Sequence, residues 1–193
     1  MDLTSRYAVK SDCRDKLEEY YIPDEWWSRK AEYPWAAQFV KPRDWVADMA
    51  CGVHHFFKHY LAQHSECVYA VDNDPELNKL PTTMKLMPIV SDLWHVPAIA
   101  DSSLDIVYCI SVLEHLIPDG RLMSLKEMHR VLKPNGLVVC TFDVPIVTPE
   151  EFGATATKSG LIWAGPLDMT CPADALYSGA YKLNVFMAVL RKP

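Results

Sequence analysis

The sequence predicts an α/β fold, in the form of a Rossmann-like, doubly wound and mostly parallel sheet with helices on both faces. Short apolar runs alternate with amphipathic segments along most of the chain, which indicates βαβ units. Half of the 193 residues are hydrophobic and 23% are charged, so the chain can bury a full core. The length suits one domain, and no internal repeat or linker interrupts it. We therefore expect residues 1–193 to form a single domain.

The elements follow from the spacing of apolar residues. Strands are expected at residues 45–49, 67–71, 87–90, 104–110, 137–142 and 184–190, and helices at 54–63, 75–80 and 119–132. Asp74 should cap the second helix, and the turn at 134–136 (Pro-Asn-Gly) should stop the third. Thr148 should cap a further helix that Pro149 opens.

Residues 11–40 differ from the rest because they are rich in aromatic side chains, at a roughly helical spacing broken near Pro23 and Pro34. We expect an N-terminal helical cover here. Four of its aromatic residues could either stack on a bound molecule or pack over the sheet edge: Trp26, Trp27, Tyr33 and Trp35. The segment 166–181 is the other stretch that could form a wall of a substrate pocket.

The overall charge and hydropathy exclude several partners. The net charge is −6, the pI is near 5.6 and no basic run is present, which argues against a nucleic-acid partner. No apolar run approaches the roughly 20 residues that a membrane span needs, and the chain does not start with a leader-like segment. We expect a soluble, cytoplasmic protein with no membrane partner.

The residues that could bind metal do not form a convincing set. The six cysteines contain no CxxC pair, so neither a zinc knuckle nor a redox dithiol is indicated. His55 and His59 are four residues apart on an expected helix, but no third ligand follows at a suitable spacing. We therefore expect no metal site.

Polar residues follow four of the expected strands in turn. The first strand runs through Asp48 into a turn at Gly52, the second ends in Asp72, the third precedes Asp92 and the fourth precedes Ser111. In open parallel sheets, ligands bind beyond the carboxyl ends of the strands. An acid after the second strand can accept hydrogen bonds from both hydroxyls of a ribose, and an acid after the third can accept one from an exocyclic amine.

Four segments together resemble the class I S-adenosylmethionine-dependent methyltransferases: "VADMACGVHHF", "VYAVDND", "IVSDLWHVPAIADSSLDIVYCISVLEHL" and "EMHRVLKPNGLVVCTFDVP". The resemblance implies a seven-stranded sheet whose last strand, residues 184–190, is antiparallel. It also implies a cofactor-binding core at 45–142, a substrate-side portion at 143–193, and S-adenosyl-L-methionine as cofactor with S-adenosyl-L-homocysteine as product.

The resemblance implies cofactor roles position by position. Asp48 and Gly52 would shape the loop around the methionine part, Asp72 would hold the ribose, and Asp92 with Leu93 would meet the adenine. The full set of implied cofactor-binding residues is Asp48, Ala50, Cys51, Gly52, His54, Asp72, Asn73, Asp92, Leu93 and Ser111. Ala50 and His54 stand where the family often has glycine. His54 could crowd the cofactor carboxylate or donate a hydrogen bond to it.

Two residues are candidates for catalysis. Methyl transfer is an in-line displacement whose rate can come largely from alignment, and a base is needed only if the acceptor must lose a proton. His115 lies just past the fourth strand, and Asp143 lies at the tip of the fifth. The alternatives are a packing or capping role for His115 and a turn role for Asp143, which precedes Pro145.

We therefore expect an S-adenosylmethionine-dependent methyltransferase that acts on an oxygen or nitrogen atom of a small molecule, sugar-like or a secondary metabolite. A nicotinamide oxidoreductase would need a GxGxxG turn, which Ala50-Cys51-Gly52-Val53-His54 does not supply. A nucleic-acid amino-methyltransferase would carry an Asn/Asp-Pro-Pro-aromatic motif after the fourth strand, where Ser111-Val112-Leu113-Glu114 stands. The remaining alternative is a catalytically silent binding module or partner subunit with the methyltransferase fold.

Overall fold

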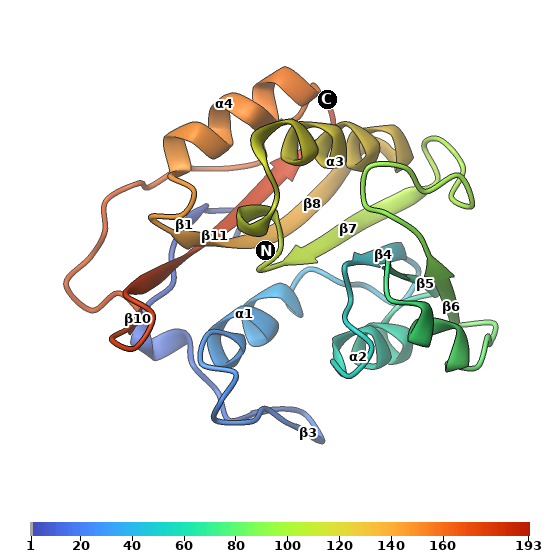
Figure 1. The fold of residues 1–193 in the computed structure, drawn as a ribbon, viewed down its shortest axis with the longest axis horizontal. Helices are drawn as coiled ribbons and strands as arrows, with labels where there is room; N and C mark the ends of the chain where they lie inside the picture. Colours follow the sequence, from blue (N-terminus) through green and yellow to red (C-terminus); the bar gives the residue numbers. More distant parts are fainter. Residues whose placement is uncertain (1) are drawn as a thin grey trace.

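The computed structural model describes residues 2–193, and its centre is a mixed sheet between two layers of helices (Figure 1). Helices α3 (Pro118–Val131) and α4 (Pro149–Ser159) cover one face, and α1 (Arg29–Ala36) and α2 (Phe57–His64) cover the other. The strands of this sheet are β1 (Arg6–Tyr7), β4 (Trp45–Met49), β5 (Cys67–Asp72), β6 (Leu86–Val90), β7 (Leu104–Ile110), β8 (Leu132–Val144), β9 (Ile162–Trp163), β10 (Tyr177–Ser178) and β11 (Leu183–Arg191).

The strand order is β1-β11-β8-β7-β4-β5-β6, and the two-residue strands β9 and β10 also pair with β11. Strands β4 to β8 run parallel, whereas β11 runs antiparallel to β8, from the pair Asn184 and Val144 to the pair Arg191 and Leu137. This confirms the expected Rossmann-like fold with an antiparallel last strand. The sheet has nine strands instead of seven: six longer strands, β4 to β8 and β11, and three two-residue strands that pair with β11.

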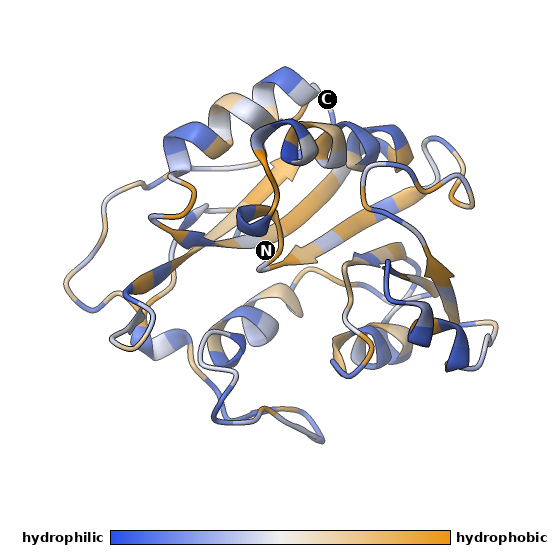
Figure 2. Ribbon diagram, in the orientation of Figure 1, coloured by the Kyte–Doolittle hydropathy of each residue, from blue (hydrophilic) through white to orange (hydrophobic). Residues whose placement is uncertain are grey.

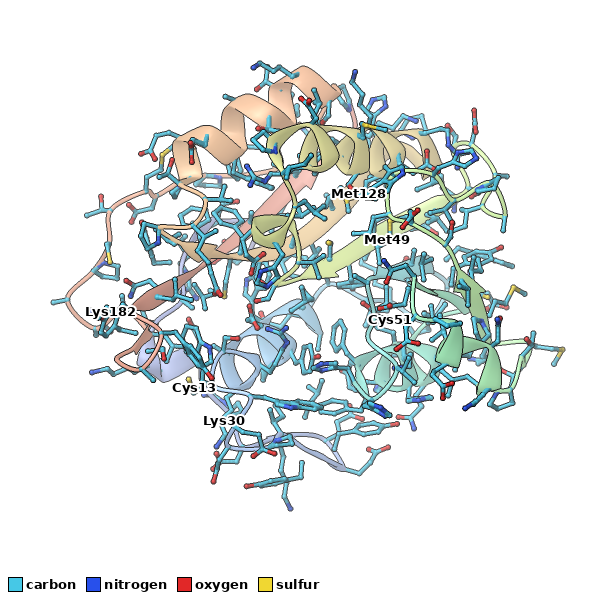
Figure 3. The ribbon with its side chains drawn as sticks, in the orientation of Figure 1. Cys13, Lys30, Met49, Cys51, Met128 and Lys182 are labelled. Carbon is cyan, nitrogen blue, oxygen red and sulfur yellow. The ribbon has the colours of Figure 1, made fainter. Side chains whose placement is uncertain are left out.

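The core lies on both faces of the sheet. Figure 2 shows that the central strands are the most apolar part of the ribbon and that the helices turn hydrophilic residues outward. Met49 and Met128 belong to the buried cluster on the α3 side, and Cys51, two residues beyond Met49, belongs to the cluster on the α2 side (Figure 3). Because both faces are covered, the strands read as nearly continuous apolar runs.

The expected caps at Asp74 and Thr148 are confirmed. Asp74 accepts a hydrogen bond from the Glu76 N–H at the start of a 3-10 helix, Pro75–Lys79. Thr148 and Glu151 form a reciprocal capping box, so two free N–H groups at the start of α4 are satisfied. Helix α3 ends before Leu132, and the expected turn at 134–136 lies inside β8, where the register with β7 shifts.

The expected helical cover over residues 11–40 is only partly present. Besides the eight-residue α1, this segment contains a hairpin of β2 (Lys16–Leu17) and β3 (Tyr20–Tyr21) and the end of a short 3-10 helix, Lys10–Asp12. Pro34 lies inside α1 and cannot donate to the Lys30 carbonyl, and the Arg14 N–H donates to that carbonyl at 2.8 Å instead. Because Pro34 has no N–H group, the Lys30 carbonyl is free to accept the bond that joins the segment before β2 to α1.

Within residues 2–193, no helix combines sufficient length with sufficient apolar character to cross a bilayer.

Candidate functional site

Two adjoining cavities lie at the carboxyl ends of the parallel strands. The loop cavity is lined by residues of the turn after β4, of the end of β7, and of α1 and α2: Arg29, Tyr33, Asp48, Ala50, Cys51, Gly52, His55, Phe57, Ile110, Ser111 and Val112. The edge cavity is lined by residues that follow β5, β6 and β7: Ala50, Asp72, Asn73, Ser91, Asp92, Leu93, Trp94, Val112 and Leu116. Ala50 and Val112 line both, so the two cavities are neighbours.

Nine of the ten residues expected to bind the cofactor line one of these cavities. The exception is His54, which is exposed and lines neither, whereas the adjacent His55 lines the loop cavity. The sequence pattern could not separate the two histidines, because the backbone of residues 50–55 is a turn and not the first turn of a helix. Helix α2 starts at Phe57, three residues later than expected.

The turn after β4 has an unusual backbone. Ala50 has φ 60° and Gly52 has φ 58°, both in the left-handed region. A side chain on Gly52 would lie 2.5 Å from Cδ2 of His55, so glycine is required there on two grounds. Ala50 bears a strain of about 1–2 kcal/mol in this conformation. Strain of this kind persists where surrounding contacts fix the backbone.

Lys58 supplies those contacts. Its side chain is fully buried, and its ammonium group donates to the carbonyls of Gly52 (2.6 Å), Val53 (3.0 Å) and His55. Burial lowers the pKa of Lys58, while Cys51, Asp48 and Asp72 act to raise it. Lys58 was not predicted as a site residue from the sequence. The signal that could have found it is a lysine among the apolar residues of the expected helix, which indicates a buried charge.

Asp72 connects the end of β5 to the same turn. One carboxylate oxygen accepts from the Gly52 N–H at 2.8 Å and the other from the Asp74 N–H at 3.0 Å. Each oxygen keeps a further lone pair for a ligand hydroxyl.

Asp48 is a buried carboxyl beside the loop cavity. Its Oδ2 has no hydrogen-bond partner in residues 2–193. Burial raises its pKa to about 7, against the opposing charges of Lys58 and Arg29. A buried carboxyl without a donor is costly, so this oxygen suits a ligand N–H group.

A buried polar network fixes α1 to the sheet. Glu32 on α1 is fully buried and accepts from Arg29 (2.5 Å), from the Ser111 hydroxyl after β7 (2.6 Å) and from the Thr141 hydroxyl in β8 (2.6 Å). Burial acts to raise the pKa of Glu32, but the Arg29 charge and these hydrogen bonds leave it below its usual value. No local sequence signal could have found this network, since its bonds join residues 79 and 109 positions apart.

A third cavity, the tryptophan cavity, opens between the N-terminal segment and the strand ends. It is lined by Glu25, Trp26, Trp27, Ser28, Arg29, His55, Ser111, His115 and Asp143. It shares Arg29, His55 and Ser111 with the loop cavity. Both candidate catalytic residues, His115 and Asp143, thus lie on one cavity beside the expected cofactor site. The lining of these three cavities includes no residue of 166–181.

The four aromatic residues of the N-terminal segment lie in two different environments. Trp26 and Trp27 line the tryptophan cavity, whereas Tyr33 and Trp35 are 3% and 7% exposed and pack in the core. Tyr33 also forms a hydrogen bond with Nδ1 of His55 at 2.7 Å, and the Trp26 ring lies 4.3 Å from the His55 ring. Burial, with the charges of Arg29 and Lys58, lowers the pKa of His55 to about 4, so its imidazole is neutral near pH 7.

Residues 47–140, which contain the turn after β4 and the ends of β5, β6 and β7, match the sequence family described as a methyltransferase domain. This match, together with the fold, supports a class I S-adenosylmethionine-dependent methyltransferase. S-adenosylmethionine is the cofactor of this class, and the methyltransferase domain fits it. The turn at Gly52 leaves no room for a side chain, Asp48 has a free buried oxygen, and Asp72 retains acceptor capacity for a ribose.

Part of the chain is similar in sequence to a protein from an archaeon. An uncharacterised protein of Methanocaldococcus jannaschii is 32% identical over 117 residues, which is 59% of this chain. The match covers 48% of that relative, so the chain corresponds to about half of its length.

Two solved structures have a similar fold. One is a Burkholderia thailandensis 1,6-didemethyltoxoflavin N1-methyltransferase with bound S-adenosylhomocysteine (TM-score 0.65, 16% identity, 88% of this chain and 81% of that one). The other comes from the complex between the Haloferax volcanii Trm112 methyltransferase activator and a methyltransferase (TM-score 0.65, 17% identity, 88% and 92%).

Proposed function

We propose that this methyltransferase transfers a methyl group from S-adenosylmethionine to an oxygen or nitrogen atom of a small molecule held in the tryptophan cavity. The observation that carries the proposal is the shared wall of Arg29, His55 and Ser111 between the loop cavity and the tryptophan cavity. Because the same three residues line both cavities, a cofactor in the loop cavity and an acceptor in the tryptophan cavity would lie next to each other, as in-line transfer requires. The tryptophan cavity encloses about 240 Å³, which suits a small acceptor.

On the cofactor side, the residues would bind and orient. Asp48 and the turn at Gly52 would hold the methionine part, Asp72 with Asn73 the ribose, and Asp92 with Leu93 the adenine. When bound, the cofactor supplies an electrophilic methyl group on a positively charged sulfur.

On the acceptor side, the chain would align the acceptor and receive its proton. Asp143 is 8% exposed, and burial together with the Glu32 charge raises its pKa to about 6, while Arg29 and His115 partly oppose the shift. A base with a pKa near the working pH is efficient, and a base contributes roughly 10²–10⁴-fold where a proton must leave. His115 is exposed on the same cavity and is the second candidate base.

A second candidate function is that of a methyltransferase-fold subunit that acts only with a protein partner. It is favoured by an exposed apolar hollow beside the edge cavity, lined by Trp94, Leu116, Ile117, Asp119, Gly120 and Met123. The similarly folded Haloferax chain was solved in complex with an activator. Methyl transfer by the purified chain alone would exclude this alternative.

Calorimetric titration with S-adenosylmethionine and S-adenosylhomocysteine tests the cofactor site. We expect Asp72→Ala to weaken both affinities by about tenfold or more, because a half-buried acceptor for the ribose hydroxyls is lost. The matched control is Glu66→Ala, which removes an exposed carboxylate at the opposite end of the same strand. Equal binding by Asp72→Ala and the wild type would exclude the assigned cofactor site.

A further inference from the structure

The tryptophan cavity has two carboxylates that form no ion pair within residues 2–193, although the charges of Arg29 and His115 act on Asp143. Arg29 is the cavity's fixed positive charge, but it is already paired with the buried Glu32 at 2.5 Å. His55 is neutral near pH 7 because its pKa is lowered to about 4, mainly by burial. Within residues 2–193, neither Glu25 nor Asp143 takes part in an ion pair. The cavity therefore favours a positively charged ligand.

Asp143 has a carboxylate oxygen that accepts no hydrogen bond from the described residues. It lines the cavity, its side chain is more than nine-tenths buried, and its Oδ1 has no hydrogen-bond partner among the described residues. Leaving a buried carboxylate oxygen unpaired is unfavourable, and an N–H donor on a ligand would remove that cost.

Glu114 is a further buried carboxyl without an ion-pair partner in residues 2–193, and the charge of Asp143 acts on it. It is 4% exposed, and neither of its oxygens has a partner in the described part of the chain. Its pKa is raised to about 8 by burial and by the charges of Asp143 and Glu32, which Arg29 only partly offsets. Burial together with the charges of Asp143 and Glu32 thus favours the protonated form of the Glu114 carboxyl near pH 7.

Two tryptophan side chains also line the cavity. Trp26 and Trp27 are half-buried there, and the Trp26 ring is supported by the His55 ring at 4.3 Å. The faces of tryptophan rings attract cations more strongly than those of other aromatic side chains. A supported ring also loses little freedom when a ligand arrives.

We propose that the acceptor is an amine, which the tryptophan cavity binds in its ammonium form through Asp143 and the rings of Trp26 and Trp27. The inference rests on the proposed function, and it narrows the accepting atom to nitrogen. Phosphate and carboxylate acceptors are disfavoured, because the one arginine on the cavity wall is already paired with Glu32.

Methyl transfer to an ammonium group needs two steps, the loss of a proton and the displacement at the methyl carbon. Asp143 takes one proton from the ammonium group, which frees the nitrogen lone pair. That lone pair forms the new N–C bond to the methyl carbon while the C–S bond breaks and its electrons remain on sulfur. The methylated product leaves as a cation, and Asp143 returns its proton to solvent.

Binding of three isosteric probes tests this inference: benzylamine, benzyl alcohol and benzoate, each titrated into the protein with and without S-adenosylhomocysteine. Tryptophan fluorescence and calorimetry report the affinities. We expect benzylamine to bind about tenfold or more tighter than benzyl alcohol, with benzoate weakest. Asp143→Asn should remove most of this preference, and Trp26→Leu should reduce it. The matched control Glu66→Gln should leave the preference unchanged.

The outcomes separate this inference from the proposed function. Binding of benzyl alcohol or benzoate as tightly as benzylamine, or a full preference retained in Asp143→Asn, would overturn the amine assignment. Unchanged S-adenosylhomocysteine affinity in Asp143→Asn shows that this variant is folded. If S-adenosylhomocysteine does not bind but the amine preference remains, the proposed function fails and the ammonium site stands.

Discussion

The two halves of the candidate site are assembled in different ways. The cofactor half is held by bonds within a short stretch of chain: Lys58 reaches back three to six residues, and Asp72 reaches Gly52 across 20. The acceptor half depends on Glu32, whose bonds to Ser111 and Thr141 span 79 and 109 residues. Damage to α1 should therefore remove acceptor binding first, whereas damage to the turn after β4 should remove cofactor binding first.

Glu32→Leu should have the largest effect. It removes the fully buried partner of Arg29, whose side chain is 17% exposed, and breaking a largely buried pair in this way costs about 3–5 kcal/mol of unfolding free energy. Urea unfolding measures the loss. Asp15→Asn, which removes an exposed partner of Lys30, is the control and should unfold like the wild type. In the folded fraction, binding of benzylamine should fall more than binding of S-adenosylhomocysteine.

Lys58→Met should have the opposite effect on the two ligands, and should weaken binding of S-adenosylhomocysteine more than binding of benzylamine. It keeps the length of the side chain but leaves three loop carbonyls without their charged donor, at a cost of about 2–3 kcal/mol in stability. Cofactor affinity should fall by about tenfold or more, because Gly52 and the turn that follows it lose the bonds that fix their backbone. Lys126→Met replaces an exposed lysine and is the control. Cofactor affinity equal to that of the wild type would contradict the assigned positioning role.

The pH dependence of methyl transfer identifies the base. Burial and the Glu32 charge raise the pKa of Asp143 to about 6, with Arg29 and His115 opposing. Glu114, whose own pKa is raised to about 8, is the remaining titratable neighbour. A base acts when deprotonated, so the rate should rise with pH through about 6 and then level off. Asp143→Asn should flatten this rise. His115→Ala should lower turnover and leave cofactor affinity unchanged, and full activity in that variant would exclude His115 as a base.

Tyr33→Phe should have the smallest effect. It removes the hydrogen bond to His55 but keeps the ring that stacks on Phe57 at 4.8 Å. The cost should be about 1 kcal/mol in stability. Because His55 borders both cavities, we expect a modest rise in KM for the acceptor, measured by initial rates at saturating cofactor. An effect as large as that of Glu32→Leu would mean that this one bond, and not the buried network, holds α1 in place.

The same contrast explains how much could be predicted from the sequence. The bounds of β4 and β7 follow from continuous apolar runs, and the residues after β4, β5 and β6 line the loop and edge cavities as expected. Local patterns determine these features. Lys58, His55 and Glu32 were missed because their roles depend on a nonhelical turn and on contacts across the fold. The helical cover was overestimated because aromatic residues at helical spacing pack equally well from a hairpin and loops.

The most direct test of the account is a transfer assay with the purified chain. S-adenosylmethionine with a deuterated methyl group and benzylamine are incubated together, and the products are followed by mass spectrometry. We predict deuteriomethylated benzylamine and S-adenosylhomocysteine in equal amounts, with transfer strongly reduced in Asp72→Ala and in Asp143→Asn but not in Glu66→Gln. Binding of both molecules without any transfer would contradict the account and indicate a binding module with the methyltransferase fold.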